Sequence, residues 1–494
     1  MTEGLAGRLV MAAVAGLLLA VSLPPWRVWP AAVIGLASLG GTLRGRSWLR
    51  RAALGAAAGA VWFGITLRWV AAFTVPGAVL LVAVQAAFPA VAAALTPSGR
   101  GRWLAFPGAL VLVEALRYRW PLGGVPLSSL ALGQVEGPLR EAAGIVGPLG
   151  MLLALAGAAS VLGGGLGTTR GRPVVGALAA VAIVVAPTLL PTAPGTQPTG
   201  PPMVVAAVQG GGPRGIPAVL ADVGEPDRVF ERHLEVGRQA GDGLALLLWP
   251  EDTVDVPGRF TGSSAHRQLA ALAADLDTRV VAGVVEDAGD SSPGLRRFRN
   301  AAVVVGADGR IVARYDKVLR VPFGEYVPWR AVLDRFVDLS LIPRDAVPGT
   351  GVGLLSTPQG DLGVMVSFEG LFPDRARAAV RAGGQLLLLP TNASSYVTDD
   401  VPAQELAAAR LRALETGRAV AMAAPTGYSA VIEADGTILA QSELETPALV
   451  RAAITPRTGR TPYVVMGDGP VVVAGLLLVA LGWGRARRPK RIFR

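Results

Sequence analysis

The most constraining feature of this chain is a series of long apolar runs, most of them within its first 191 residues. The runs are long enough, or nearly long enough, to cross a bilayer. They occupy residues 9–22, 28–42, 52–67, 76–95, 103–117, 143–164, 174–191 and 468–483. This pattern predicts a membrane domain of seven transmembrane helices over residues 1–191 and an eighth transmembrane helix over residues 468–483.

The rest of the chain reads as a globular domain. Residues 203–455 mix charged and apolar residues, although the whole chain is 51% hydrophobic and only 17% charged, too apolar for an ordinary soluble protein. Short β-branched runs alternate with helical patterns there, which predicts an α/β domain whose strand density suits a core of two sheets. The Pro-rich segment 192–202 cannot continue a helix, so it is predicted to be a linker.

The arginines in the short loops indicate an orientation, because cytoplasmic loops accumulate positive charge. If the N-terminus is inside, the second, fourth and sixth loops are cytoplasmic and hold Arg44, Arg46, Arg50, Arg51, Arg100, Arg102, Arg170 and Arg172. The basic tail 484–494 is then cytoplasmic too, as an even number of spans requires. Three arginines in the fifth loop oppose this asymmetry: Arg117, Arg119 and Arg140. The 203–455 domain is therefore predicted to be extracytoplasmic, with both termini cytoplasmic.

Charge and residue usage exclude several classes of function. The net charge is +10, but the basic residues gather in the loops and the tail, which argues against a nucleic-acid partner. The absence of cysteine excludes disulfides, zinc–thiolate sites and a cysteine nucleophile. The only histidines are His233 and His266, and both are interpreted as structural. We therefore expect no metal and no organic cofactor.

Three predicted strands each end in polar residues. Leu246–Trp249 leads through a proline to Glu251, Arg314–Asp316 leads to Lys317, and Gly363–Val366 leads to Ser367. Taken singly, such residues are more often solvated loop residues. In an α/β domain, however, ligands gather at strand ends, so the three can converge on one pocket. The apolar strand before Glu251 would desolvate its carboxylate and raise its pKa. Lys317 is the only lysine outside the tail, which suggests a need for a compact ammonium.

These segments carry a resemblance to a known superfamily. Trp249-Pro-Glu251, Tyr315-Asp-Lys317 with Val321–Pro328, and Val366-Ser-Phe-Glu369 look like the three signatures of the carbon–nitrogen hydrolases, the nitrilase superfamily. With apolar spans on both flanks, the chain resembles the apolipoprotein N-acyltransferases over essentially its whole length. The resemblance implies an α-helical multi-span membrane domain plus a nitrilase-like αββα sandwich.

The resemblance also implies roles for particular residues. That family uses a Glu, Lys, Cys triad in which cysteine is the nucleophile, glutamate its base and lysine a stabiliser of the oxyanion. By motif, Glu251 and Lys317 take the last two roles and Ser367 stands in the nucleophile position. Supporting roles are implied for the residues Glu325, Glu369, Phe368 and Asn300, the last of which lies just ahead of a predicted strand over residues 301–305.

Serine in the nucleophile position is a departure that bears on activity. A thiol is partly ionised near neutrality, whereas an alcohol needs a stronger base, usually a histidine relay. No histidine lies in the three motifs, so this Ser367 form is predicted to be inactive or very slow. The sequence leaves two origins open: a deliberate replacement of cysteine, favoured because serine is nearly isosteric, and a natural variant.

By resemblance, the predicted function is lipoprotein maturation at the bacterial cell membrane. A fatty acyl chain would pass from a glycerophospholipid, through an acyl-enzyme, to the N-terminal amine of a diacylated apolipoprotein. The alternatives are a membrane-anchored amidase of the nitrilase superfamily and an inactive lipoprotein-binding paralogue. Residues 326–343 interleave apolar and charged side chains, which favours an ordinary packed helix slightly over a lid that dips into the outer leaflet.

Overall fold

The structure is a computed structural model that describes residues 4–487 apart from residues 100, 167–171, 213–223, 290–295, 336–338, 340–341 and 395–399. The chain divides into two compact units. One comprises Met1–Thr192 with Val465–Arg494, and the other comprises Ala193–Val464. The expected basic loop around Arg170 and most of the expected basic tail lie outside the described residues.

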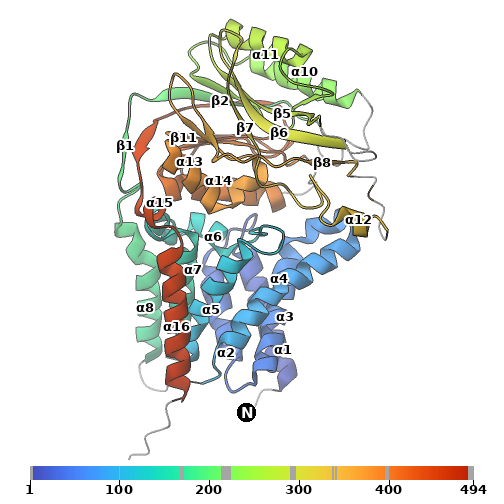
Figure 1. The fold of residues 1–494 in the computed structure, drawn as a ribbon. Helices are drawn as coiled ribbons and strands as arrows, with labels where there is room; N and C mark the ends of the chain where they lie inside the picture. The colour runs from blue at the N-terminus through green and yellow to red at the C-terminus, as the bar shows by residue number, and fades with distance from the viewer. Residues whose placement is uncertain are drawn as a thin grey trace, which may run out of the picture. The chain divides into compact units, whose positions relative to one another are not determined.

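The first unit is built from helices that cover the apolar runs (Figure 1). The longer ones are α1 (Leu5–Val21), α2 (Pro30–Thr42), α3 (Trp48–Thr66), α4 (Val75–Leu95), α5 (Arg102–Arg117), α7 (Ala143–Leu166), α8 (Arg172–Val185) and α16 (Gly469–Arg487). Short helices connect them: η1 (Arg68–Ala72), α6 (Leu130–Gly133), η2 (Gln134–Glu136), η3 (Pro138–Ala142) and η4 (Ala186–Leu189). A further short helix, α15 (Pro462–Met466), precedes α16.

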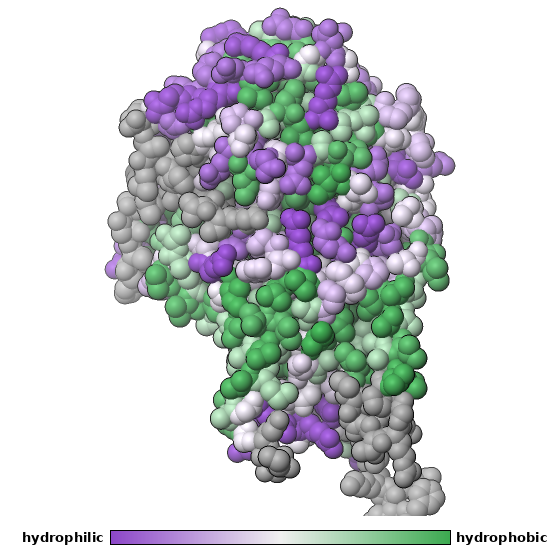
Figure 2. Space-filling model, turned by 180° about the vertical axis from the view of Figure 1, so that it is seen from behind, coloured by the Kyte–Doolittle hydropathy of each residue, from purple (hydrophilic) through white to green (hydrophobic). Residues whose placement is uncertain are grey.

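Many apolar side chains of this unit face outward. Val79, Leu80, Leu178 and Leu477 are all more than half exposed, and Figure 2 shows hydrophobic residues covering much of the visible surface of the helices. Among the described residues, three helices are long and apolar enough to cross a membrane by themselves: Val75–Leu95, Pro138–Gly164 and Gly469–Arg487. The apolar helices at Leu5–Val21, Pro30–Thr42 and Val174–Leu189 are shorter.

Small residues let two of these helices, α5 and α16, approach closely. A Cβ atom built on Gly108 of α5 would lie 2.4 Å from the backbone oxygen of Gly475 of α16, so a larger residue would force the pair apart. Close approach through glycine is a common way for helices to pack where the surroundings are apolar, because it maximises van der Waals contact between backbones.

The second unit contains two large sheets and a small one. The first sheet has the strand order β15-β2-β3-β5-β6-β7, with β4 beside β5 and β8 beside β6, and the second has the order β14-β13-β12-β11-β10-β9. The first-sheet strands are β2 (Met203–Gln209), β3 (Leu246–Leu248), β4 (Val254–Val256), β5 (Val280–Asp287), β6 (Arg296–Val305), β7 (Ile311–Asp316), β8 (Arg344–Ala346) and β15 (Ala448–Ile454). The second-sheet strands are β9 (Leu354–Leu355), β10 (Leu362–Val364), β11 (Leu386–Pro390), β12 (Val420–Ala423), β13 (Ala430–Ile432) and β14 (Ile438–Gln441).

These sheets form the middle of a four-layer αββα sandwich (Figure 1). Helices α10 (Glu225–Arg238) and α11 (Ser264–Asp275) pack on one face of the first sheet, through residues such as Leu234 and Leu272. Alternate residues of the same strands, such as Leu246 and Leu248, face the second sheet. Helices α13 (Pro373–Ala382) and α14 (Asp400–Thr416) cover its far side. Because side chains alternate across a strand, both faces of each sheet are buried.

The parallel direction of the strands brings the segments that follow their carboxyl ends to one region. β3 runs parallel to β2 and β5, and β11 runs parallel to β10 and β12. Their carboxyl ends lead to Glu251, to the helical turn η5 (Ser367–Leu371) and to Thr391. A backbone hydrogen bond links the two sheets here, because Glu251 N–H donates to Thr391 O at 3.3 Å.

The structure corrects three expectations. Asn300, expected ahead of its strand, lies within β6, which begins at Arg296. The segment 192–202, expected to be a linker, contains β1 (Thr196–Pro198), which pairs with β16 (Arg457–Gly459) beyond the expected domain end at residue 455.

Residues 326–343 do not form one packed helix in their described part. Helix α12 covers only Arg330–Leu333, and Trp329, which precedes it, is 71% exposed. Phe336, Asp338 and Leu341 of that segment lie outside the described residues.

Candidate active site

Glu251 is held in a buried position directly after β3. The three residues of β3 are completely buried, and the chain then passes through Trp249 and Pro250 to Glu251, which is only 4% exposed. Its Oε1 atom accepts hydrogen bonds of 2.8 Å from Lys317 Nζ and from Asn300 Nδ2. An apolar strand therefore delivers a carboxylate into the protein interior, where two side-chain donors orient it.

Lys317 supplies the ammonium group of the site. It follows β7, is 2% exposed, and its Nζ lies 2.8 Å from Glu251 and 3.0 Å from Glu325. Its backbone N–H donates to Asn300 O at 2.8 Å, and its backbone oxygen accepts from Gly349 N–H at 2.8 Å. Both the side chain and the backbone of Lys317 are thus fixed by neighbours, which limits the positions that its charge can occupy.

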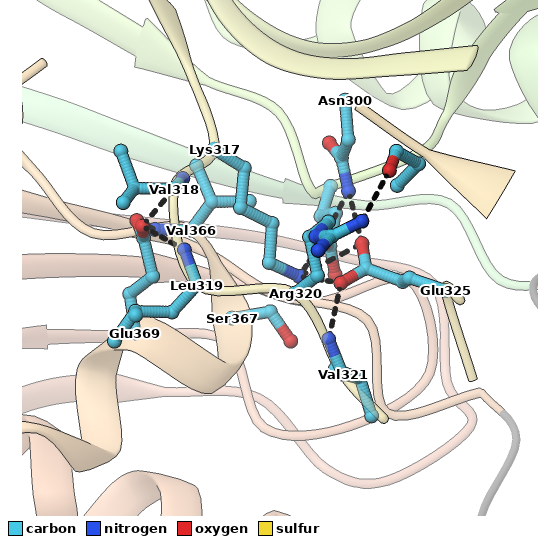
Figure 3. A network of polar contacts seen from close by, with 12 residues as sticks. Asn300, Lys317, Val318, Leu319, Arg320, Val321, Glu325, Val366, Ser367 and Glu369 are labelled. Carbon is cyan, nitrogen blue, oxygen red and sulfur yellow. Dashed lines mark hydrogen bonds and ion pairs between the residues drawn. The ribbon is translucent and has the colours of Figure 1, made fainter. Parts of the chain in front are cut away.

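Glu325 and Asn300 complete this polar cluster. Asn300 Nδ2 donates to the Oε1 atoms of both Glu251 and Glu325, each at 2.8 Å, and Glu325 Oε2 accepts from the backbone N–H of Val321 at 2.7 Å (Figure 3). One asparagine therefore bridges the two carboxylates that share the ammonium of Lys317. Buried charges require such pairing, because an isolated ion in the interior is strongly disfavoured.

The balance of burial and neighbouring charges raises the pKa of both members of the central ion pair. Burial raises the pKa of Glu251 above its ordinary value, the positive charge of Lys317 opposes that rise, and Glu325 adds to it. Burial by itself would lower the pKa of Lys317, but the carboxylates of Glu251 and Glu325 outweigh it and hold this pKa above its ordinary value. Lys317 is therefore a permanent cation at neutral pH, and Glu251 is a stronger base than an exposed glutamate.

Ser367 occupies a strained backbone position at the start of η5. Its φ is 49°, in the left-handed region that non-glycine residues seldom adopt. The residue is 8% exposed, and its Oγ atom lies 3.3 Å from Thr391 Oγ1, within hydrogen-bonding distance. Figure 3 draws Ser367 together with Lys317, Glu325 and Glu369. The backbone oxygen of Thr391 also accepts the backbone N–H of Glu251, so the backbone beside the hydroxyl is held next to the backbone of Glu251.

Glu369 joins the two backbone segments around these groups. It is completely buried, and its Oε1 accepts from the N–H groups of Val318 and Leu319 at 2.9 and 3.1 Å and from Tyr315 Oη at 2.8 Å. Its Oε2 accepts from Val366 N–H at 2.9 Å. Glu369 thus fixes the loop after Lys317 against the turn that carries the serine.

The structure places the remaining predicted site residue, Phe368, outside the polar cluster. Its ring lies edge-on to Phe372 with a centroid distance of 5.0 Å.

Sequence reasoning missed Thr391 and Glu405, whose carboxyl accepts a hydrogen bond from Thr391. A signal for Thr391 existed, because it follows the apolar run of β11 in the same way that Glu251 follows β3. Among the described residues, no group of three or more histidine, aspartate or glutamate side chains could hold a metal ion.

Comparisons with known proteins define the class. The family described as carbon–nitrogen hydrolase matches residues 205–463, so the sandwich is that of a carbon–nitrogen hydrolase. The family described as the apolipoprotein N-acyltransferase N-terminal domain matches residues 15–161. An apolipoprotein N-acyltransferase of Geobacter metallireducens is 30% identical over 95% of this chain and 94% of that protein. The chain belongs to the apolipoprotein N-acyltransferase family, and it is an acyltransferase and an integral membrane protein.

Further relatives agree in length. The apolipoprotein N-acyltransferase of Methylococcus capsulatus is 29% identical over 97% of this chain and 96% of that protein, and the one of Shewanella oneidensis is 26% identical over 97% and 96%. Among solved structures, an amidase from Nesterenkonia sp. is 22% identical, with a TM-score of 0.39, and the match covers 55% of this chain and 95% of that one.

Proposed function

We propose that this protein transfers a fatty acyl chain from a glycerophospholipid to the N-terminal amine of a diacylglyceryl-cysteine apolipoprotein, by way of an acyl ester on Ser367. The observation that carries the proposal is the buried ion pair of Glu251 and Lys317, 2.8 Å apart, in a site where Thr391 contacts the Ser367 hydroxyl with its side chain and the backbone of Glu251 with its own backbone. This arrangement supplies a base, a fixed positive charge and a nucleophilic atom, which are the groups that acyl transfer requires.

In the first half of the reaction, Ser367 Oγ attacks the ester carbonyl carbon of the phospholipid. The serine proton passes to a carboxylate, for which Glu251 is suited by its raised pKa. The ammonium of Lys317 stabilises the negative charge that develops on the carbonyl oxygen. Collapse of the tetrahedral intermediate breaks the ester bond, and the departing glycerol oxygen takes up the proton, so that a lysophospholipid leaves.

In the second half, the α-amine of the apolipoprotein attacks the acyl ester of Ser367. The amine must lose a proton as the amide bond forms, and Glu251 accepts it. The serine oxygen leaves as an alcohol, which regenerates the hydroxyl. Exclusion of water from the buried site favours transfer to the amine over hydrolysis.

Serine makes the first half slow. An alcohol is far less acidic than a thiol, whose pKa is about 8.5, so less of the reactive anion is available at neutral pH. We propose that this chain transfers acyl groups much more slowly than a Ser367→Cys variant would. The same observation favours a second candidate function, an inactive paralogue that binds lipoproteins without turnover.

The proposal includes a membrane arrangement. Eight spans, with residues 203–455 outside and both termini in the cytoplasm of a bacterial cell, would bring the site to substrates that are themselves embedded in lipid. The arginines of the second, fourth and sixth loops support this orientation. The exposed side chains of Phe323, Trp329 and Val332, which are 48%, 71% and 55% exposed, support a contact of residues 323–332 with the outer leaflet, where lipid would enter.

One assay tests the function. The parent chain, Ser367→Cys and Ser367→Ala are incubated with a phospholipid and a diacylated lipopeptide, and the triacylated product is measured by mass spectrometry. We expect Ser367→Cys to be on the order of 10²-fold faster than the parent or more, and Ser367→Ala to give no product. A Cys variant that binds the lipopeptide but transfers nothing would favour the binding paralogue. Release of free fatty acid or ammonia with water as acceptor would favour a membrane-anchored amidase.

A further inference from the structure

Glu405 is a buried carboxyl group that the mechanism above leaves unused. It lies on α14, is 6% exposed, and is hydrogen-bonded to Thr391. Its Oε2 atom is buried and has no hydrogen-bond partner among the described residues. A buried acid with an unsatisfied oxygen destabilises a fold, because neither water nor protein compensates its desolvation. Its position within reach of the site therefore calls for a functional explanation.

Thr391 connects Glu405 to the reacting hydroxyl. Its Oγ1 atom lies 3.3 Å from Ser367 Oγ and is also hydrogen-bonded to the Glu405 carboxyl. A threonine hydroxyl has one donor and two acceptor positions, and its hydrogen rotates. The same atoms therefore allow Ser367 to donate to Thr391 while Thr391 donates to Glu405. The three residues then form a continuous path for a proton.

We propose that Thr391 and Glu405 form a second proton-accepting route from the Ser367 hydroxyl, alongside Glu251, and that this route partly compensates for the weak acidity of serine. As Ser367 Oγ bonds to the carbonyl carbon, its proton moves to Thr391 Oγ1 and the proton of Thr391 moves to the Glu405 carboxylate. When the intermediate collapses, Thr391 donates its proton to the departing glycerol oxygen, which leaves as an alcohol, and Glu405 returns its proton to Thr391 Oγ1. Glu405 acts only through Thr391 and does not touch substrate. The inference rests on the proposed acyl-enzyme on Ser367.

The charges around Glu405 suit this role. Burial raises the pKa of Glu405 to about 8, the hydrogen bond from Thr391 lowers it, Glu251 raises it and Lys317 lowers it. Of the elements packed against α14, β12 and β13 carry no ionisable side chain, η5 carries Glu369, and α13 carries Asp374, Arg375, Arg377 and Arg381. A base works best when its pKa lies near the working pH.

The test measures how fast Ser367 reacts in the full-length protein in detergent. The probe is an alkyl fluorophosphonate, which phosphonylates activated serine and is detected by intact mass. In the parent we expect the labelling rate to rise roughly tenfold between about pH 7 and about pH 9, with a midpoint near 8. Glu405→Gln should label at least about tenfold more slowly at pH 8 and lose the midpoint. Ser367→Ala should remain unlabelled.

Two matched comparisons separate the route from folding effects. Thr391→Val removes the bridging hydroxyl and should behave like Glu405→Gln, whereas Thr391→Ser keeps the hydroxyl and should retain the midpoint. Glu415→Gln makes the same chemical change on the same helix, at a completely buried carboxylate that pairs with Arg412 at 2.7 Å. It should keep the parent's pH profile even if the protein becomes less stable.

The outcomes that overturn the inference are distinct from those that overturn the function. A Glu405→Gln variant that labels with the parent's rate and midpoint overturns the route, as does a parent whose Ser367 is not labelled at any pH. A parent that labels with the expected profile but transfers no acyl chain to a diacylated lipopeptide leaves the route standing and removes the proposed function.

Discussion

The carboxylate of Glu369 accepts a 2.9 Å hydrogen bond from the backbone N–H of Val318, the residue that follows Lys317. Its other oxygen accepts a hydrogen bond of the same length from Val366, the residue that precedes Ser367. A single buried carboxylate therefore holds the backbone beside the ammonium at a fixed position relative to the backbone beside the hydroxyl. Side chains that must cooperate within a few tenths of an ångström depend on such supporting contacts.

Glu369→Gln should loosen this connection. An amide offers one acceptor oxygen instead of two, so at least one buried N–H loses its partner at a cost of about 1–3 kcal/mol. We expect a lower melting temperature in detergent and slower phosphonylation of Ser367. Glu433→Gln, a partly exposed carboxylate in the turn after β13, is the control and should change stability by less than about 0.5 kcal/mol. Unchanged labelling in Glu369→Gln would mean that the contact does not position the serine.

Lys317→Met should be the most damaging change in the site. It leaves Glu251 and Glu325 buried together without the cation that lies 2.8 and 3.0 Å from them, and losing one partner of a buried ion pair costs about 3–5 kcal/mol. Thermal unfolding and lipopeptide transfer should both show the loss. Lys317→Arg keeps the charge, so it should be more stable than Lys317→Met, yet its planar, wider head group should not restore transfer. Parental transfer by the arginine variant would contradict a role for a point charge here.

Glu405→Gln should stabilise the protein in a pH-dependent way. The pKa of Glu405 is raised to about 8, against about 4.3 for an unfolded glutamate, so the folded state binds the proton more tightly. The contribution of this carboxyl to stability is therefore most favourable below the unfolded pKa and is lost as pH rises toward 8. Glutamine resembles the protonated carboxyl and does not ionise, so the variant does not lose this stability as the pH rises. The gain in melting temperature should be small near about pH 5 and largest near about pH 9, where it corresponds to a few kcal/mol. A gain that does not depend on pH would contradict the raised pKa.

The absence of cysteine from the chain allows a direct test of membrane orientation. Single cysteines introduced as Ser47→Cys and Thr261→Cys replace exposed residues of similar size. In intact cells, a membrane-impermeant maleimide should label Thr261→Cys and should label Ser47→Cys only after the membrane is permeabilised. Both variants keep every arginine of the basic loops, so the charges that favour the orientation are unchanged. The reverse labelling pattern would place residues 203–455 in the cytoplasm.

The sequence alone predicted the features that depend only on residues close together in the chain. Apolar runs indicated the helices, because hydropathy is a property of neighbouring residues. The strand before Glu251 and the tyrosine and aspartate before Lys317 indicated polar strand ends, and the structure brings these two side chains within 2.8 Å. The same local patterns failed where residues 326–343 looked amphipathic, because a four-residue helix and exposed side chains are found there instead.

The tertiary structure alone decided which distant residues meet. Thr391 lies beside Ser367 because the neighbouring parallel strands β10 and β11 lead to these two residues at the same edge of the sheet. Glu405 meets Thr391 because α14 packs on that sheet. The bridging position of Asn300 likewise depends on its pairing within β6 and on the loop that presents Glu325. Periodicity reports burial one segment at a time, whereas pKa values, ion pairs and proton routes arise from groups that only long-range packing brings together.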